Sequence, residues 1–314
     1  MAGRAKHESI KMREKLDPQV AQYLNTVRSR PPAHLLSIET LRGEIDKIGD
    51  HYPPEPVGKI EDVDMPSPSG NIPLRVYSPE GKGPFPPVVF FHGGGWCIGS
   101  VAGYDGFCSV LTNRVPAVVF SVGYRLAPEH PFPAAIEDCY VALGYIAKNA
   151  ANFNADPGRL AVIGDSAGGT IAAVMSIKSK KEGGPKIALQ VLIYPATDLS
   201  HTDSASYKLF GEGYDLDKRM IEIFRSHYLP DKKEWVNPYV SPMLAKDLRG
   251  LPKALIITAE YDPMRDDGIE FAARLKKSGV PVRHSMYKGV IHGFLSFTTF
   301  HAAQRAFDEI SRAF

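Results

Sequence analysis

Ser166 is the residue whose surroundings most strongly suggest chemistry. It sits at the centre of a Gly-x-Ser-x-Gly pattern (residues 164–168), between a β-favouring run, LAVIGD, and an alanine-rich stretch suited to a helix. A serine hydroxyl becomes a useful nucleophile only when a base takes its proton and a third group orients that base. A sharp strand-to-helix turn with small neighbours exposes such a serine, so the pattern predicts a nucleophile elbow. The alternative is an ordinary tight turn with a hydrogen-bonding serine.

A glycine-rich segment closes an earlier apolar run, in the sequence VVFFHGGGW. Consecutive glycines let backbone amides approach a ligand closely, because no Cβ interferes. We expect the amides of Gly94 and Gly95, together with that of Ala167 after the serine, to form an oxyanion hole. A phosphate-binding loop is the competing interpretation, but the lysine and the Ser/Thr of that motif are missing.

The base must come from the histidines that follow Ser166, since the order in a strand–elbow–helix site is serine, acid, histidine. These histidines are His201, His227, His284, His292 and His301. The first two lie in a long insertion, the third alternates with apolar residues in a strand, and the last lies on an amphipathic helix. His292 follows the final predicted strand beside a glycine, where an imidazole can reach the sheet edge. It is therefore the predicted base.

Two aspartates follow predicted strands and could orient that histidine. Asp198 comes after LQVLIYPAT, and Asp262 comes after KALIITAEY. Both positions are geometrically possible for the acid. Asp262 lies one strand before His292, but the residues alone leave both open.

The elements that must hold these side chains form an alternating pattern. A predicted hairpin, VGKIEDVDMP and NIPLRVYSP, comes first, and short apolar runs alternating with helical segments follow it. Continuously apolar strands alternating with helices indicate a mainly parallel sheet covered on both faces. The sequence predicts an α/β fold with eight strands, the second of them antiparallel.

Two segments stand outside this alternation. The first 50 residues read as two amphipathic helices, one beginning at Asp17-Pro18 and one at Ser37. Residues 200–247 form a polar and aromatic insertion with one helical stretch around residues 218–228, and its size favours a functional lid. We predict that the two segments pack together above the sheet edge and wall the pocket around Ser166. The alternative is that the first segment packs against the core at a place away from this pocket.

Composition excludes several other functions. The 314 residues are 44% hydrophobic and 23% charged, and 37 basic against 35 acidic residues give a net charge of +2, so nothing favours nucleic acid or an anionic membrane as partner. No run approaches the length of a membrane span, and the N-terminus lacks the apolar region of a secretory signal. The three cysteines lack metal-ligand spacing. These features predict a reduced, cytoplasmic enzyme.

Five motifs in this order resemble those of the hormone-sensitive lipase family, the bacterial family IV carboxylesterases. They are HGGGW, YRLAPEHPFPAA, GDSAGG, EYDPMRDDG and IHGF, and the likeness runs from about residue 57 to residue 300. The resemblance implies an α/β-hydrolase fold, ester hydrolysis without a metal or organic cofactor, and a lid over the acyl site, with the helical N-terminus as cap. The DPMRDD match favours Asp262 over Asp198 as the acid. In this family His92 orders the glycine loop through hydrogen bonds.

Together these interpretations predict a catalytic core over residues 51–199 and 248–314, and a helical cap over residues 1–50 and 200–247. The predicted function is a carboxylesterase that acts on small esters with short- to medium-chain acyl groups, about four to eight carbons by the family resemblance. Its predicted catalytic residues are Ser166, Asp262 and His292.

Other activities stay open beside this one. A lactonase, an amidase or a lipase would use the same site, because fold alone does not decide substrate. A non-catalytic small-molecule-binding protein would lack a triad residue, and none is missing here. Trp96 could line the acyl pocket or simply pack. The sequence leaves the oligomeric state open between a monomer and a homodimer.

Overall fold

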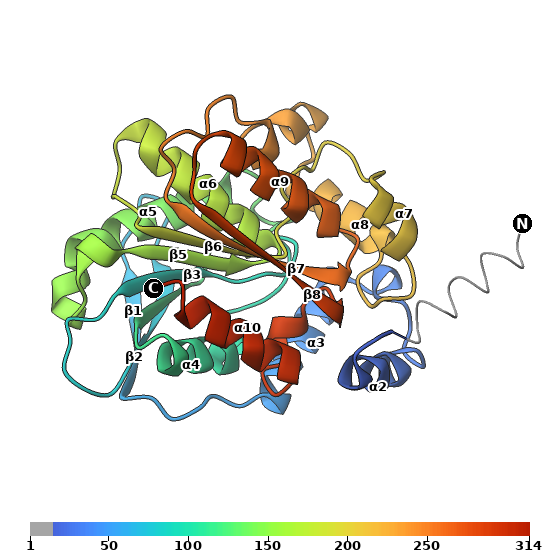
Figure 1. The fold of residues 1–314 in the computed structure, drawn as a ribbon, viewed down its shortest axis with the longest axis horizontal. Helices are drawn as coiled ribbons and strands as arrows, with labels where there is room; N and C mark the ends of the chain where they lie inside the picture. Colours follow the sequence, from blue (N-terminus) through green and yellow to red (C-terminus); the bar gives the residue numbers. More distant parts are fainter. Residues whose placement is uncertain (1–14) are drawn as a thin grey trace, which may run out of the picture.

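The computed structural model describes residues 15–314, apart from the side chains of residues 46 and 48–51. Residues 1–14, with which the predicted cap begins, lie outside the described residues. Eight strands form one sheet in the order β1-β2-β4-β3-β5-β6-β7-β8 (Figure 1). Their bounds are β1 Lys59–Met65, β2 Ile72–Ser78, β3 Pro87–Phe91, β4 Val118–Val122, β5 Ala161–Asp165, β6 Leu189–Ile193, β7 Lys253–Tyr261 and β8 Val282–Ile291.

Strand direction follows the expectation from the sequence. β2 pairs antiparallel with both β1 and β4, and the remaining neighbours pair parallel. Strands β3 to β6 are buried along their whole length, as their continuously apolar sequences predicted. The predicted eight-stranded, mainly parallel sheet with an antiparallel second strand is confirmed.

Helices cover both faces of this sheet. In the described part of the chain the α-helices are α2 Pro18–Val27, α3 Ile38–His51, α4 Asp105–Arg114, α5 Ala134–Asn149, α6 Ala167–Glu182, α7 Ala205–Phe210, α8 Lys218–Tyr228, α9 Arg265–Lys277 and α10 His301–Ser311. Short 3-10 helices are η1 Ala33–Leu35, η2 Ala102–Tyr104, η3 Ala150–Phe153, η4 Pro157–Arg159, η5 Lys232–Val236, η6 Pro242–Leu244 and η7 Phe294–Ser296. Helices α5, α6 and α9 lie on one face, and α4 and α10 on the other (Figure 1).

The core is split by the sheet into two apolar clusters, because successive side chains of a strand point to opposite faces. In β3, Val89 and Phe91 join the cluster under α5, α6 and α9. Val88 and Phe90 join the cluster under α4 and α10. The carboxyl ends of the parallel strands therefore emerge from a rigid base at a single sheet edge.

The first N-terminal helix begins at the predicted residue, but its apolar side packs against a different part of the chain from the one we predicted. α2 starts at Pro18, and the Asp17 carboxylate caps it by accepting the Gln19 amide. Val20 and Leu24 belong to the apolar cluster of α4 and α10. The backbone amide of Asp17 also donates to the carbonyl of Gly289 in β8 at 2.8 Å. The apolar stripe of α2 thus lies mainly against the sheet face covered by α4 and α10, whereas we expected it to pack with the insertion.

The insertion at residues 200–247 contains more helix than its sequence indicated. The helix predicted around residues 218–228 is α8. A second α-helix, α7, is only six residues long and is capped by Ser204, whose hydroxyl accepts the Tyr207 amide. A helix of fewer than two turns has too few residues to display a 3.6-residue period, which explains why periodicity missed it.

Candidate active site

Ser166 occupies a strained turn between β5 and α6. Its φ and ψ are 53° and −119°, outside the regions that L-residues favour, and its amide donates to the carbonyl of Ile193 at 2.8 Å. The turn is so tight that a Cβ built on Gly168 would lie 1.9 Å from the carbonyl oxygen of Phe91. The elbow predicted from the Gly-x-Ser-x-Gly pattern therefore has the expected geometry, with a serine at the carboxyl edge of the sheet.

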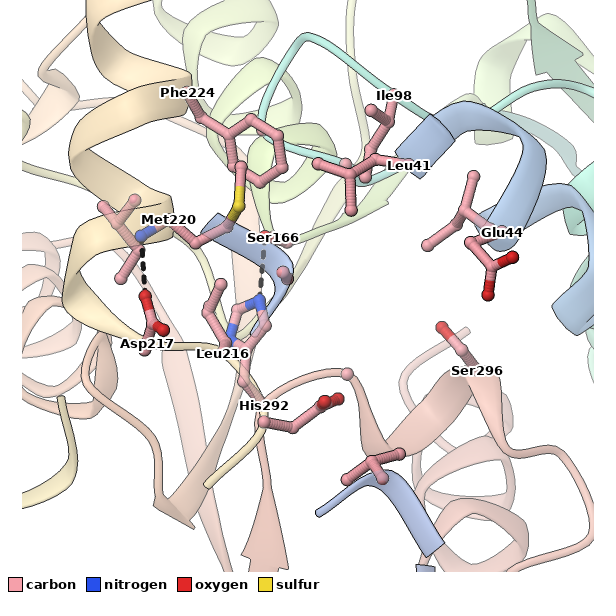
Figure 2. Close-up of a pocket in the computed structure, with 18 of the residues that line it drawn as sticks. Leu41, Glu44, Ile98, Ser166, Leu216, Asp217, Met220, Phe224, His292 and Ser296 are labelled. Atoms are coloured by element: carbon pink, nitrogen blue, oxygen red, sulfur yellow. Dashed lines mark hydrogen bonds between the residues drawn. The ribbon is translucent and has the colours of Figure 1, made fainter. Parts of the chain in front are cut away.

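The predicted base and acid lie in a hydrogen-bonded line with this serine. His292 Nε2 is 2.8 Å from Ser166 Oγ, a contact marked by the dashed line in Figure 2. His292 Nδ1 is 2.8 Å from Asp262 Oδ2. The Asp262 carboxylate is fully buried, and its other oxygen accepts the amide of Met264 at 2.7 Å. Three residues from the ends of three different strands thus converge on one site.

The alternative acid and two of the other histidines, His201 and His284, contact other groups. Asp198 Oδ1 accepts the amide of Ser200, and its other oxygen faces His201 Nε2 at 3.6 Å. His284, inside β8, contacts the hydroxyl of Thr258 at 3.0 Å. The structure therefore sets Asp262, and not Asp198, against His292.

The charges around His292 favour its protonated form. Burial alone would lower the pKa of this imidazole, but the charge and hydrogen bond of Asp262, with the charges of Asp165 and Asp215, raise the pKa above its ordinary value. A base with a raised pKa takes a proton more readily, and it remains neutral over a narrower range of pH.

The glycine loop, residues 92–98, lies beside Ser166. Gly94 has a φ of 107°, and its carbonyl accepts the amides of Cys97 and Ile98, both at 3.0 Å. A Cβ at Gly94 would lie 2.2 Å from the carbonyl oxygen of Ile98, so this turn needs glycine. Within residues 15–314, the amides of Gly94, Gly95 and Ala167 donate no hydrogen bond to a protein acceptor. All three residues line the same cavity as Ser166 and His292.

Asp165 fastens the glycine loop to the elbow. One oxygen of its buried carboxylate accepts the amide of Gly93 at 2.8 Å, and the other accepts the hydroxyl of Tyr104 at 3.1 Å. Burial raises the pKa of Asp165 to about 6, although the hydrogen bond from Tyr104 opposes the shift. Tyr104 lies in η2, and no motif in the sequence pointed to it. His92 supports the same loop: its ring stacks on Tyr124 with centroids 4.2 Å apart.

A cavity of about 1030 Å³ opens above Ser166 and is walled by segments far apart in the sequence. Figure 2 shows Leu41 from α3, Ile98 from the glycine loop, and Met220 and Phe224 from α8 around it. The wider lining draws on both outlying segments; from residues 15–51 it includes Tyr23, Leu24, Leu36, Leu41 and Ile45, and from the insertion Asp215, Leu216, Met220, Ile221 and Phe224.

Trp96 lines this cavity and also packs. Its ring stacks on Tyr228 of α8, with centroids 4.5 Å apart and planes at 2°. Trp96 is 4% exposed, so only its edge is available to a ligand. Trp96 therefore packs on α8 and lines the cavity, and its contact with an acyl chain stays a prediction.

In residues 15–314, no three His, Cys, Asp or Glu side chains are grouped so that they could hold a metal ion. Nor does any helix there have the length and apolar character needed to cross a bilayer. Cys97, Cys108 and Cys139 are buried free thiols.

Known proteins resemble this chain in sequence and in fold. A protein-family model described as an alpha/beta hydrolase fold matches residues 88–296. The carboxylic ester hydrolase LipN of Mycobacterium tuberculosis is 43% identical over 243 residues, which are 76% of this chain but only 64% of LipN. An arylesterase of Saccharolobus solfataricus is 34% identical over 287 residues, 89% of this chain and 92% of that protein. The solved structure of a hyperthermophilic esterase from Pyrobaculum calidifontis superposes with a TM-score of 0.91 at 38% identity, covering 95% of this chain and 97% of the other.

Proposed function

Because the chain belongs to the α/β-hydrolase fold family, among the carboxylesterases that resemble hormone-sensitive lipase, we propose that it hydrolyses carboxylic esters through an acyl-enzyme on Ser166. One observation carries the proposal: the unbroken line from Ser166 Oγ through His292 to Asp262, with both contacts at 2.8 Å. Such a line supplies a nucleophile, its base and the group that orients the base.

Acylation begins when Ser166 Oγ attacks the ester carbonyl carbon. The hydroxyl proton passes to His292 Nε2, and the carbonyl π electrons move onto oxygen to give a tetrahedral oxyanion. Asp262 holds the proton on Nδ1, so that Nε2 is free to accept, and it stabilises the imidazolium that forms. Collapse of the intermediate breaks the bond to the alcohol oxygen, which takes the proton from Nε2 and leaves.

Deacylation repeats these steps with water. His292 Nε2 removes a proton from a water molecule as its oxygen attacks the acyl carbon. The second tetrahedral intermediate expels Ser166, which recovers its proton from the imidazolium, and the carboxylic acid departs. The enzyme returns to its starting state, and the overall reaction consumes one water for each ester.

The oxyanion in both steps needs hydrogen-bond donors that are already in place. We assign this role to the amides of Gly94, Gly95 and Ala167, which have no protein acceptor in the described chain and line the cavity beside Ser166. Ala167 is the first residue of α6, so the partial positive charge of the helix N-terminus adds to its amide. Fixed donors of this kind stabilise the developing charge without reorganisation.

The predicted domain division is part of this proposal. The core would comprise residues 51–199 and 248–314, and the cap residues 1–50 and 200–247. Support comes from the cavity wall, to which both cap segments contribute apolar side chains. Hydrogen bonds between them add to this, among them Tyr23 Oη to Asp215 at 3.0 Å and His34 Nδ1 with Asp217 at 2.8 Å. We expect the acyl chain to lie among Leu41, Met220 and Phe224, which favours short- to medium-chain esters.

A panel of p-nitrophenyl esters, from butyrate to palmitate, tests the activity and the chain-length preference together. We expect turnover of the short esters and a decline toward palmitate. A fluorophosphonate should label Ser166, identified by mass spectrometry of the tryptic peptide, and labelling should abolish turnover. If the esters are inert while lactones or amides are cleaved, the reaction assignment is wrong and the serine assignment survives.

Oligomeric state and location can be measured beside the activity. Light scattering distinguishes the two oligomeric states left open by the sequence, since a monomer has the 34.4 kDa chain mass and a homodimer twice that mass. A cytoplasmic location is expected to show as activity in the soluble fraction of the source cells, with none secreted.

A further inference from the structure

Arg42 joins the N-terminal segment to the glycine loop. It lies on α3, outside the catalytic core, and its guanidinium reaches three acceptors. Nε donates to the carbonyl of Cys97 at 2.9 Å, and one terminal nitrogen donates to the carbonyl of Ala127 at 2.9 Å. Both terminal nitrogens bind Glu129, at 2.9 and 2.7 Å. A planar fork with five donors can satisfy such a set, whereas an ammonium group cannot.

The Cys97 carbonyl, one acceptor of Arg42, belongs to the turn that presents the oxyanion donors. The carbonyl of Cys97 shares its peptide unit with the amide of Ile98, which donates to the carbonyl of Gly94 at 3.0 Å, so the peptide that Arg42 holds closes the turn containing Gly94 and Gly95. The amide of Ala127 donates to the carbonyl of Trp96 at 2.9 Å. Arg42 therefore bonds to both backbone segments that hold this turn, at Cys97 and at Ala127. It does so from outside the cavity.

Helix α8 of the insertion holds the same loop from a second side. Phe224 packs so closely on the loop that a Cβ added to Gly95 would lie 2.3 Å from its ring. The thiol of Cys97 faces the Phe224 carbonyl at 3.8 Å, and Trp96 stacks on Tyr228. Leu41, next to Arg42, and Ile98 of the loop point into the cavity together with Phe224 (Figure 2). The glycine loop is thus held between α3 and α8, each of which contacts it directly.

We propose that Arg42 is a positioning residue that couples the helical N-terminal segment to the oxyanion-binding turn, so that this segment supports turnover as well as enclosing substrate. The proposal rests on the function proposed above. Without Arg42, the carbonyls of Cys97 and Ala127 and the Glu129 carboxylate lose their shared donor. The 94–97 turn is then free to shift, and a displacement of about 1 Å in a catalytic group can cost about 100-fold in rate.

The test replaces Arg42 with methionine, which keeps the length of the apolar stem, and with lysine, which keeps the charge. We expect Arg42→Met to lower kcat by about 10- to 100-fold while KM changes less than about threefold. Arg42→Lys should recover only part of the loss, because three donors on a single nitrogen cannot reach the four oxygens that the guanidinium binds. If the methionine variant does not fold, the lysine variant gives the same kcat-against-KM comparison.

A second readout separates positioning from mere stability. Trifluoromethyl ketones add to a serine and place a negative oxygen in the oxyanion hole, so their Ki should rise in proportion to the loss of kcat/KM across the Arg42 variants. Arg114→Met is the matched control: Arg114 pairs with Asp308 at 2.6 Å on the far face, away from the cavity. That control should lower the unfolding temperature and leave kcat and Ki unchanged.

Failure of this inference is distinct from failure of the proposed function. Arg42 variants with wild-type kcat and Ki overturn the inference, as does a rise in KM with kcat unchanged, which would make Arg42 a substrate-binding residue. A wild-type protein without ester turnover, or a Ser166→Ala variant that keeps it, overturns the proposed function instead.

Discussion

Replacing Asp262 with asparagine gives a sharp test of the mechanism, because the structure determines which way the new amide must face. One oxygen of Asp262 accepts the Met264 amide at 2.7 Å, and the other faces His292 Nδ1 at 2.8 Å. In Asp262→Asn, the amide oxygen has to keep the bond from Met264, since an NH2 group cannot accept it. The NH2 group then points at His292 Nδ1.

That orientation reverses the histidine tautomer. Nδ1 must become an acceptor, so the ring proton moves to Nε2, the atom that has to take the proton of Ser166. We expect a loss of about 10⁴-fold in turnover, the cost typical of a wrong tautomer with intact geometry. At about 1.4 kcal/mol for each factor of ten, this is about 5.5 kcal/mol of transition-state stabilisation.

The assay compares kcat/KM on p-nitrophenyl butyrate for Asp262→Asn, Asp198→Asn and the wild type at one pH. Asp198 bonds to Ser200 and faces His201, so its substitution should cost less than tenfold. Circular dichroism confirms that each variant is folded. The reasoning is refuted if Asp262→Asn stays within tenfold of the wild type, or if the two variants rank in the reverse order.

Three other substitutions and conditions follow from the site. Ser166→Ala should reduce turnover by about a million-fold with the fold intact, measured by kcat and thermal unfolding; residual activity of a few per cent in pure protein contradicts the nucleophile assignment. Because the pKa of His292 is raised above 6.5 and the neutral ring is the base, kcat/KM should fall as pH decreases, with its midpoint above 6.5; a midpoint below 6.5 contradicts the electrostatic account. Met220→Trp should fill part of the acyl region and shift the p-nitrophenyl ester optimum toward shorter chains, while an unchanged profile would place the acyl chain elsewhere.

Local patterns explain why much of the site could be predicted from sequence. The turn around Ser166 is specified by residues adjacent to it, since Gly168 must let the Phe91 carbonyl approach. The strands were recognisable because a parallel sheet covered on both faces needs continuously apolar runs. His292 stood out because it follows the last predicted strand.

Features that depend on how segments far apart in the sequence come together were harder to predict from the sequence. Asp198 and Asp262 both follow strands, so apart from the family resemblance only the three-dimensional direction of each loop separates them. The apolar stripe of α2 identifies a buried face without saying what covers it, and the cover is the core around α10. Arg42 stands on a helix rich in polar residues, and its three acceptors lie 55 to 87 positions away in the chain.

The anchoring of α2 restricts how substrate can enter. Its N-terminal end is bonded to Gly289, three positions before His292, and the Gln19 side chain accepts the backbone amide of His301. A segment bonded to the chain both before and after His292 cannot move away without disturbing that base. We therefore expect opening of the entrance to begin beyond α2, with the Pro31-Pro32 stretch as the hinge. Because Arg42 bonds α3 to the glycine loop, movement of α3 would also release the oxyanion-binding turn. Amide hydrogen exchange would then be slow in α2 and fast in α3. A phosphonate bound to Ser166 would slow exchange in α3 and leave the rate in α2 unchanged.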